Sequence, residues 1–318
     1  MTGVLGTVAP PVRGICPVLE TPFNDDESVD YASFDRLVEH VVGTGVRSVM
    51  FPGFASEFYK LGDEERTELT ERLLRRVASI QGFTAVISVP DHATRLAVTR
   101  AVAAAEAGAG AINILPPHQL GPSGSSVREH IRAVARAVAP VPVVVQYAPA
   151  QTGTALDAAT IASLAADEPN VSQVKVESTP PGSLISALLN QTPSLSSVVG
   201  YGGVQLIDAL RRGAVGAQPG CSFTELYVAI WNAWEGGDRD DAVRLHTRLL
   251  PYISYWMQSV ELIIAAEKRI SQRRGIIASD RCRSPLRRLD SEEEAMIDRF
   301  LAEFAHHLPS PAFQKEIQ

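Results

Sequence analysis

Short apolar runs alternate with longer amphipathic segments over the first two thirds of the chain. The short runs have the length and composition of buried strands, and the segments between them have a helical period. We expect strands at residues 12–23, 46–51, 84–89, 111–115, 142–147, 171–177, 197–200 and 214–218, and helices at 30–43, 63–80, 92–107, 127–139, 158–166, 182–189 and 204–212. Eight strands that alternate with helices predict an α/β fold, the (β/α)8 TIM barrel. A doubly wound open sheet is disfavoured because no Gly-x-Gly-x-x-Gly motif follows the first strand.

The last third of the chain has helical periodicity alone. Four segments, at residues 227–234, 240–255, 261–274 and 291–306, supply more helix than an eighth barrel unit needs. We therefore expect a barrel that carries the active site at 12–223, then an eighth helix and a C-terminal helical extension at 224–308. Residues 1–11 and 309–318 are expected to be tails.

Composition and charge exclude several classes of protein. The net charge is −7, whereas a nucleic-acid-binding domain needs a basic face. The three cysteines are far apart and have neither metal-site nor disulfide-framework spacing. No apolar run approaches the roughly 20 residues of a membrane span, and the first residues lack the charged leader of a signal peptide. We expect a cytoplasmic protein with neither a nucleic acid nor a membrane as partner.

A lysine lies in the middle of the sixth expected strand. Because side chains on a strand alternate between its faces, Val171, Gln173, Lys175 and Glu177 share one face. Arginine stays protonated in proteins, whereas a lysine amine can lose its proton and act as a nucleophile. Lys175 is thus a candidate nucleophile inside the barrel. The alternatives are a buried ion pair with Glu177 and a side chain that extends to solvent from the strand end.

Active sites of such barrels lie at the carboxyl ends of the strands. Tyr147 ends the fifth expected strand, beside the strand of Lys175, and a phenol can move protons to and from a carbinolamine. A metal-dependent site is disfavoured because only His92 and His118, of seven histidines, fall at expected strand ends. The remaining candidates at strand ends are Thr21, Gly53, Phe54, Ala55, Ser56, Glu57, Asp91, Gly200 and Gln218.

Five segments also occur in the order and spacing of a known family. They are Glu20-Thr21-Pro22-Phe23; Gly53 to Glu57 with Leu61-Gly62-Asp63-Glu64-Glu65-Arg66; Tyr147 with Pro149 and Thr152-Gly153; Val174-Lys175; and Gly213-Ala214-Val215-Gly216. With them, residues 12–306 resemble the dihydrodipicolinate synthase / N-acetylneuraminate lyase family of Schiff-base barrel enzymes. The third segment is similar to that family's Tyr-Asn-x-Pro-x-x-Thr-Gly.

The resemblance implies roles for several of these residues. Lys175 would form an imine with a 2-oxo acid such as pyruvate, Tyr147 would be the proton shuttle, and backbone N–H groups of the Gly53 loop would hold the substrate carboxylate. The covalent imine would replace any cofactor. The partners implied are a small-molecule 2-oxo acid, an aldehyde, and further copies of the chain in a homotetramer.

The chain departs from the family pattern in the loop after the second strand and after Tyr147. Phe54 and Ala55 stand where the family has two hydroxyl residues, so the hydroxyl relay is missing or moves to Ser56, and the pocket gains an aromatic wall. The segment after Tyr147 is one residue shorter, and Gln151 falls near the family's substrate-carboxylate arginine. The loss of that cation argues against aspartate semialdehyde as the second substrate.

Two further departures leave alternatives open. Glu177 lies two residues after the lysine, where it either acts as an acid/base group or pairs with an arginine. His118 stands where dihydrodipicolinate synthases have a tyrosine, and it is either a pocket residue or a surface-loop histidine. We expect structural roles for His92 and Glu57.

These features predict a metal-independent lyase that forms a lysine Schiff base with a 2-oxo acid and makes or breaks a C–C bond. A dehydratase of a 2-keto-3-deoxy sugar acid that uses the same imine is an alternative, as is dihydrodipicolinate synthase activity itself. A barrel that binds a 2-oxo acid without turnover is the alternative from another class.

Overall fold

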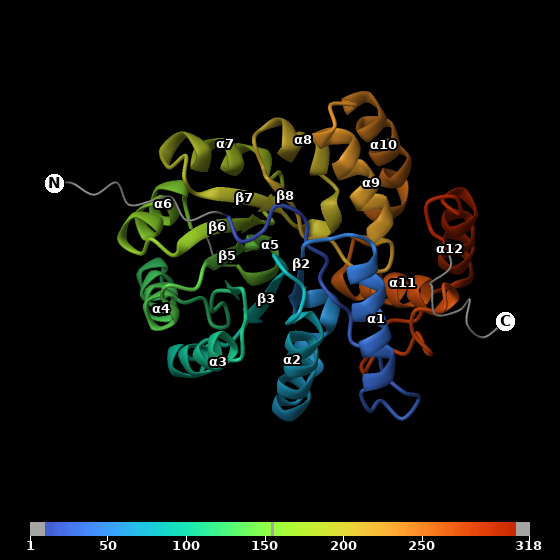
Figure 1. The fold of residues 1–318 in the computed structure, drawn as a ribbon, viewed down its shortest axis with the longest axis horizontal. Helices are drawn as coiled ribbons and strands as arrows, with labels where there is room; N and C mark the ends of the chain where they lie inside the picture. Colours follow the sequence, from blue (N-terminus) through green and yellow to red (C-terminus); the bar gives the residue numbers. More distant parts are fainter. Residues whose placement is uncertain (1–9, 154–155, 310–318) are drawn as a thin grey trace.

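The computed structural model describes residues 10–153 and 156–309, and Figure 1 shows its ring of strands surrounded by helices. All strand pairs in the sheet are parallel, in the order β1-β8-β7-β6-β5-β4-β3-β2. The strands are β1 (Gly14–Ile15), β2 (Ser48–Phe51), β3 (Thr84–Val89), β4 (Ala111–Ile114), β5 (Val143–Tyr147), β6 (Val171–Val176), β7 (Ser196–Val199) and β8 (Gly216–Ala217). Val18 bridges both Met50 and Gly220, which joins the two ends of the sheet and confirms the predicted barrel.

Helices alternate with the strands, as the apolar periodicity predicts. The barrel helices are α1 (Tyr31–Gly43), α2 (Asp63–Val77), α3 (Thr94–Glu106), α4 (Gly124–Val138), α6 (Ala158–Asp167), α7 (Gly182–Gln191), α8 (Leu206–Arg211) and α9 (Thr224–Glu235). Short turns lie in the loops: η1 (Phe54–Ser56), η2 (Phe58–Lys60), α5 (Pro149–Thr152) and η3 (Tyr201–Gly203). The extension consists of α10 (Arg239–Trp256), α11 (Val260–Arg273) and α12 (Ser291–Glu303).

The first and last strands are shorter than the sequence pattern predicts. Each has two residues, where we expected residues 12–23 and 214–218 to be extended throughout. Pro17 and Pro22 interrupt the first segment and Pro219 follows the last, and proline has no N–H to donate to a ladder. Pro17 and Pro219 still accept hydrogen bonds through their carbonyls, from Met50 N–H and Val18 N–H, and these bonds help to close the barrel.

Two apolar layers make up the core. The larger one lies between the strands and the helices, and it extends into α9, α10 and α12. A small one fills the barrel interior beneath the carboxyl ends of the strands, with Val18, Met50, Val86 and Val198 among its members. Because the interior is packed there, any site is confined to the upper, carboxyl end.

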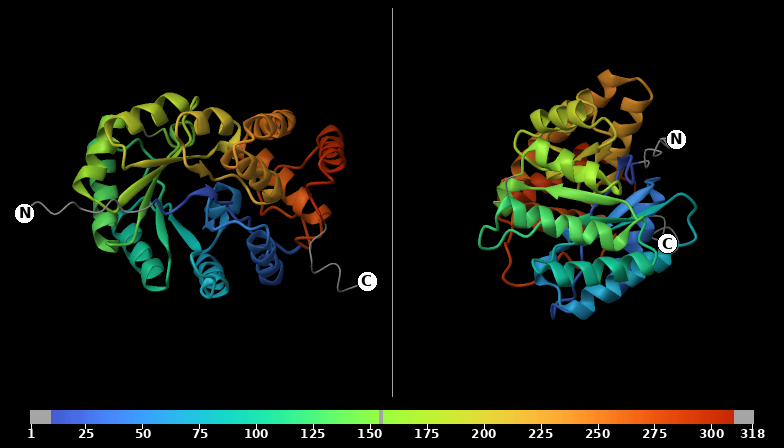
Figure 2. Two further views of the ribbon diagram at one scale, coloured as in Figure 1. Left: turned by 45° about the horizontal axis from the view of Figure 1, so that its top comes forward. Right: turned by 90° about the vertical axis from the view of Figure 1, so that its left-hand side faces the viewer.

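The helical extension lies against one side of the barrel. Figure 1 shows α11 near α1 and α12 on the outer side of α11, and the left view of Figure 2 shows the extension, in orange and red, on one side of the barrel. Ala278 N–H donates to Ser33 Oγ of α1 at 3.0 Å, and Arg283 donates to the Glu27 carbonyl. The predicted tails lie almost wholly outside the described residues. Within the described ranges, no helix has both the length and the apolar character needed to cross a membrane.

Candidate active site

Lys175 and Glu177 form a buried pair in the barrel interior. Lys175 lies on β6, and its Nζ is 3.3 Å from Glu177 Oε1. Their exposed fractions are 3% and 8%. In register Lys175 pairs with Gln146 of β5 and Val198 of β7, and Val198 belongs to the interior layer. The predicted face is confirmed for Lys175 and Glu177, whereas a register shift places Val171 in the layer between strands and helices. The ion pair that the sequence left as an alternative is present.

A chain of amide side chains holds the Glu177 carboxylate. Gln146 Nε2 donates to Glu177 Oε2 at 2.7 Å, and Asn113 Nδ2 donates to Gln146 Oε1 at 2.9 Å. The same Asn113 amide donates to Ser88 Oγ at 2.9 Å. These four side chains come from β3, β4, β5 and the end of β6, and all are buried. This network sets the orientation of the Asn113 and Gln146 amides, and the N–H of Gln146 points toward the Glu177 carboxylate.

The loop after β7 closes over the same carboxylate. Tyr201 N–H donates to Glu177 Oε1 at 3.2 Å. A Cβ on Gly200 would lie 2.3 Å from that oxygen, closer than any side chain can approach. Gly200 does not line the cavity above this pair, so its expected contact with substrate is not supported. Its lack of a side chain makes room for Glu177.

Tyr147 is not beside Lys175, and this corrects the expected geometry. Its register partner is Val176, whose side chain packs in the layer between strands and helices, and Tyr147 packs against that layer. The position beside Lys175 on the interior face belongs to Gln146. Alternation along β5 places adjacent residues on opposite faces, so the two cannot share the interior.

The sequence itself indicates that Gln146, and not Tyr147, occupies the position of the family's tyrosine. In Tyr-Asn-x-Pro-x-x-Thr-Gly the tyrosine is three residues before the proline. Counting back from Pro149, with Thr152-Gly153 in step, reaches Gln146 and not Tyr147. The apparent one-residue deletion arises from aligning the wrong residue to the tyrosine.

A cavity opens above Lys175 and Glu177 at the carboxyl end of the barrel. Of the predicted site residues, Phe54, Ala55, Gln151 and Gln218 line it together with this pair. Gln151 Oε1 and Gln218 Oε1 are buried and have no hydrogen-bond partner among the described residues. Buried acceptors normally have a hydrogen-bond partner. Because these two oxygens have none in the described part of the chain, they can accept a hydrogen bond from a ligand.

The loop between β2 and α2 is braced by its hydroxyl residues. Ser56 is fully buried; its Oγ accepts from Gly53 N–H at 2.9 Å and donates to the Leu19 carbonyl. Thr21 Oγ1 donates to the Ser56 carbonyl at 2.8 Å. Neither Thr21, Gly53 nor Ser56 lines the cavity, so the expectation that Ser56 supplies a pocket hydroxyl is wrong.

The η1 turn within this loop has backbone N–H groups that can donate hydrogen bonds to a ligand. Phe54 and Ala55 begin η1, and their N–H groups make no hydrogen bond among the described residues. The first N–H groups of a helical turn lack partners within the turn and suit a carboxylate. This is the part of the Gly53 loop that can hold a substrate carboxylate.

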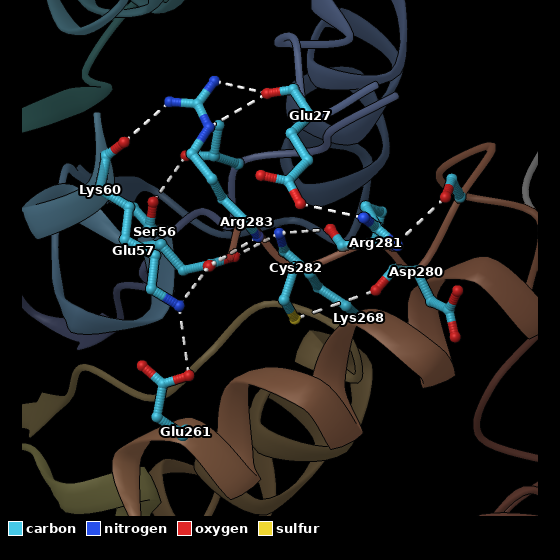
Figure 3. Close-up of polar contacts among 12 residues, drawn as sticks. Glu27, Ser56, Glu57, Lys60, Glu261, Lys268, Asp280, Arg281, Cys282 and Arg283 are labelled. Atoms are coloured by element: carbon cyan, nitrogen blue, oxygen red, sulfur yellow. Dashed lines mark hydrogen bonds and ion pairs between the residues drawn. The ribbon is translucent and has the colours of Figure 1, made fainter. Parts of the chain in front are cut away.

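Glu57 has a structural role, as expected. It is fully buried and pairs with Lys268 of α11, and its Oε2 also accepts from Lys60 Nζ at 3.1 Å and from Arg283 N–H at 3.1 Å. Figure 3 shows these contacts, which join the Gly53 loop to the helical extension. The extension therefore holds the loop in place.

His118 lies outside the cavity. Its ring packs edge-on against His92 with centroids 4.4 Å apart, and His92 Nδ1 accepts from His118 N–H. Burial lowers the pKa of His92. In the described ranges, no group of three or more His, Cys, Asp and Glu side chains is arranged to hold a metal ion.

Glu267 is an acidic cavity residue that was absent from the sequence-based candidates. Glu267 of α11 lines the cavity and is 4% exposed. Burial, together with the nearby charge of Glu20, raises its pKa to about 8. The segment that contains it showed only an amphipathic helical pattern, in which this glutamate has no distinguishing signal.

Comparison with known proteins agrees with this architecture. The model of the dihydrodipicolinate synthetase family matches residues 11–303. L-2-keto-3-deoxyarabonate dehydratase of Azospirillum brasilense is 29% identical over 292 residues, which is 89% of this chain and 91% of that protein.

Solved structures show the same likeness. The dihydrodipicolinate synthase of Rhodopseudomonas palustris superposes with a TM-score of 0.85 at 25% identity, over 93% of this chain and 99% of that one. A prophage protein of the same family from E. coli K12, solved in complex with pyruvate, gives 0.84 at 25% identity over 92% and 98%. The barrel, its helical extension and the match over residues 11–303 place this chain in the dihydrodipicolinate synthetase family, whose members are lyases.

Proposed function

We propose that Lys175 forms an imine with the carbonyl of a 2-oxo acid. The observation that carries this proposal is the 3.3 Å contact between Lys175 Nζ and Glu177 Oε1 in a buried interior. A carboxylate at this distance can accept the ammonium proton, which leaves the amine nucleophilic. The free N–H groups of Phe54 and Ala55 would receive the substrate carboxylate. The solved relative in complex with pyruvate supports the same substrate class here.

We further propose that the reaction is dehydration of a 2-keto-3-deoxy sugar acid. The protonated imine withdraws electrons, so a base can remove a proton from C3 and leave an enamine. The enamine electrons then form the C3–C4 double bond as the C4–O bond breaks, and the departing hydroxide takes a proton and leaves as water. Hydrolysis of the imine releases the product and frees Lys175. Glu177 would remove the first proton and supply the second.

The lining of the cavity favours a hydroxylated, singly charged substrate. Among the described residues, Lys175 is its one cationic side chain, beside the carboxyl groups of Glu177 and Glu267, so there is no second cation to bind a second carboxylate. Gln151 and Gln218 offer amide oxygens that accept from hydroxyl groups. The similarity to L-2-keto-3-deoxyarabonate dehydratase, over most of both chains, supports the same class.

Two measurements test these proposals. Borohydride reduction in the presence of pyruvate should give a stable adduct on Lys175, located by peptide mapping and absent in Lys175→Ala. Failure with pyruvate and with longer 2-oxo acids would remove the imine and favour a binding protein without turnover.

Mass spectrometry of products then separates the reaction types. Incubation with 2-keto-3-deoxypentonates and hexonates should give a product lighter by one water. Formation of pyruvate and an aldehyde would instead show aldol cleavage, in which the base removes the proton of the C4 hydroxyl. Condensation of pyruvate with aspartate semialdehyde would show dihydrodipicolinate synthase activity.

The family resemblance supports two broader proposals, a homotetrameric assembly and a cytoplasmic location. Light scattering coupled to size-exclusion chromatography should give a mass close to four times 34.2 kDa. A monomeric mass would contradict the assembly.

A further inference from the structure

One wall of the cavity comes from the helical extension and not from the barrel. Val260, Ile263 and Glu267 line the cavity from α11, at the spacing of three and four residues that defines one helix face. Val260 and Ile263 are apolar. Glu267 is thus the polar group of this wall, and it lies on a different element from the Lys175–Glu177 pair on β6.

The position of Glu267 is built into the backbone of the barrel. A Cβ on Gly220 would lie 1.8 Å from Glu267 Oε2 and 2.0 Å from Oε1, so the carboxyl occupies the space of the missing side chain. Glu267 Oε2 also accepts from Cys221 N–H at 3.1 Å. One hydrogen bond and close packing against Gly220 thus fix a carboxyl that borders the cavity.

The surroundings of Glu267 favour a neutral carboxyl. Glu20 lies nearby, is 1% exposed, and has two carboxyl oxygens with no hydrogen-bond partner among the described residues. Lys268, the cation that follows Glu267 in the sequence, donates a hydrogen bond to Glu57 and not to Glu267. Burial raises the pKa of Glu267 to about 8 and that of Glu20 to about 7. A protonated carboxyl both donates and accepts, which matches a hydroxyl group.

We propose that Glu267 binds a hydroxyl group in the part of the substrate farther from the keto carbon, and that it selects hydroxylated 2-oxo acids over plain ones. This inference rests on the proposed function. Lys175 and Glu177 act at the imine, and Glu267 contacts another part of the substrate from α11. The apolar neighbours Val260 and Ile263 exclude water from this contact, so loss of the hydroxyl leaves a buried polar group unpaired.

The test compares two ligands on three variants. The concentration for half-maximal borohydride trapping is measured for pyruvate and for a 2-keto-3-deoxypentonate. In Glu267→Leu we expect the pentonate value to rise at least tenfold and the pyruvate value to change less than threefold. Glu267→Gln keeps the shape and should give an intermediate rise. Glu129→Gln, the same change at an exposed position of α4 and outside the cavity, is the matched control.

Gly220→Ala gives an independent variant, because its new methyl displaces the carboxyl without altering it. It should reproduce the selective rise for the pentonate. Unchanged values, or equal changes for the two ligands, would overturn the role of Glu267 while leaving the imine intact. Absence of trapping in the unaltered protein would overturn the proposed function and this inference together. Circular dichroism of each variant separates loss of binding from loss of fold.

Discussion

Gln146 and Glu177 lie on neighbouring strands and are joined by a 2.7 Å hydrogen bond from the Gln146 amide to the Glu177 carboxylate. The bond directs one carboxylate oxygen toward the amide and leaves the other, Oε1, 3.3 Å from Lys175 Nζ. The interior group beside Lys175 is therefore the Glu177 carboxylate, which the Gln146 amide orients. We propose that this carboxylate carries out the proton transfers.

Replacement of Glu177 should abolish turnover and retain imine formation. A positioned acid/base group contributes about 10²–10⁴ in rate, so we expect Glu177→Gln to lower kcat by at least about 10². Borohydride trapping of pyruvate should persist, though more slowly, because the amine remains. Glu129→Gln, an exposed change on α4, is the control. Full activity of Glu177→Gln would remove this residue from the mechanism.

We expect substitutions of Tyr147 and of Gln146 to have opposite effects on kcat: little change for the first and a clear loss for the second. Tyr147→Phe deletes a hydroxyl that lies on the helix side of β5, so kcat should stay within about threefold of the unaltered value. Gln146→Leu removes the hydrogen bond to Glu177 and should lower kcat by roughly tenfold or more, since a group misplaced in an active site loses rate steeply. Steady-state kinetics of both variants decide the matter. A large loss in Tyr147→Phe alone would restore the tyrosine as the proton shuttle.

Gly200→Ala should disturb the site through packing. The added methyl would overlap the Glu177 carboxyl, at 2.3–2.6 Å from its atoms, and overpacking of this kind costs about 1–3 kcal/mol of stability. We expect a matching loss of activity, because Glu177 must move. Gly43→Ala meets no atom within 4 Å and lies in α1, where alanine is favoured by about 0.4–1 kcal/mol. Urea titrations that fail to separate the two variants would refute the close contact.

The buried carboxyls predict a pH dependence of stability. The pKa values of Glu267 and Glu20 rise from 4.5 to about 8 and about 7, mainly through burial. Between pH 4.5 and these raised pKa values, the two carboxyls keep protons in the folded chain that they have released in the unfolded chain. Their contribution to stability is complete below about pH 4.5 and is lost as the pH rises through the folded pKa values.

The measurement is the free energy of unfolding in urea against pH. From about pH 5 to 8, the unaltered chain should lose stability relative to Glu267→Gln, with a slope of up to about 1.4 kcal/mol per pH unit. A constant difference between the two curves would show that Glu267 ionises normally in the folded chain.

Lys268→Met should destabilise the protein far more than a surface substitution. It leaves the buried Glu57 carboxylate without its nearest cation, and removal of one partner from a buried pair costs about 3–5 kcal/mol. Arg244→Met, which breaks an exposed pair with Asp241, should cost less than about 1 kcal/mol. Similar midpoints for the two variants would argue against a structural role for Glu57.

Periodicity along the sequence was sufficient to predict the order of the eight strand–helix units. Asp30 caps α1 by accepting from Ser33 N–H at 2.9 Å, as the residue type predicts. The shared face of Lys175 and Glu177 also follows from the two-residue period of a strand. These features depend on neighbours in the chain, so the local sequence contains the necessary information.

What only the tertiary structure decided is how segments far apart in sequence meet at the mouth of the barrel. The hydrogen bond from Gln146 to Glu177 joins residues 31 positions apart, and the brace on Glu57 joins residues 211 positions apart. Glu267 reaches the cavity because Gly220, on another element, leaves space for it. Such contacts arise from closure of the barrel and docking of the extension, and no local period records them.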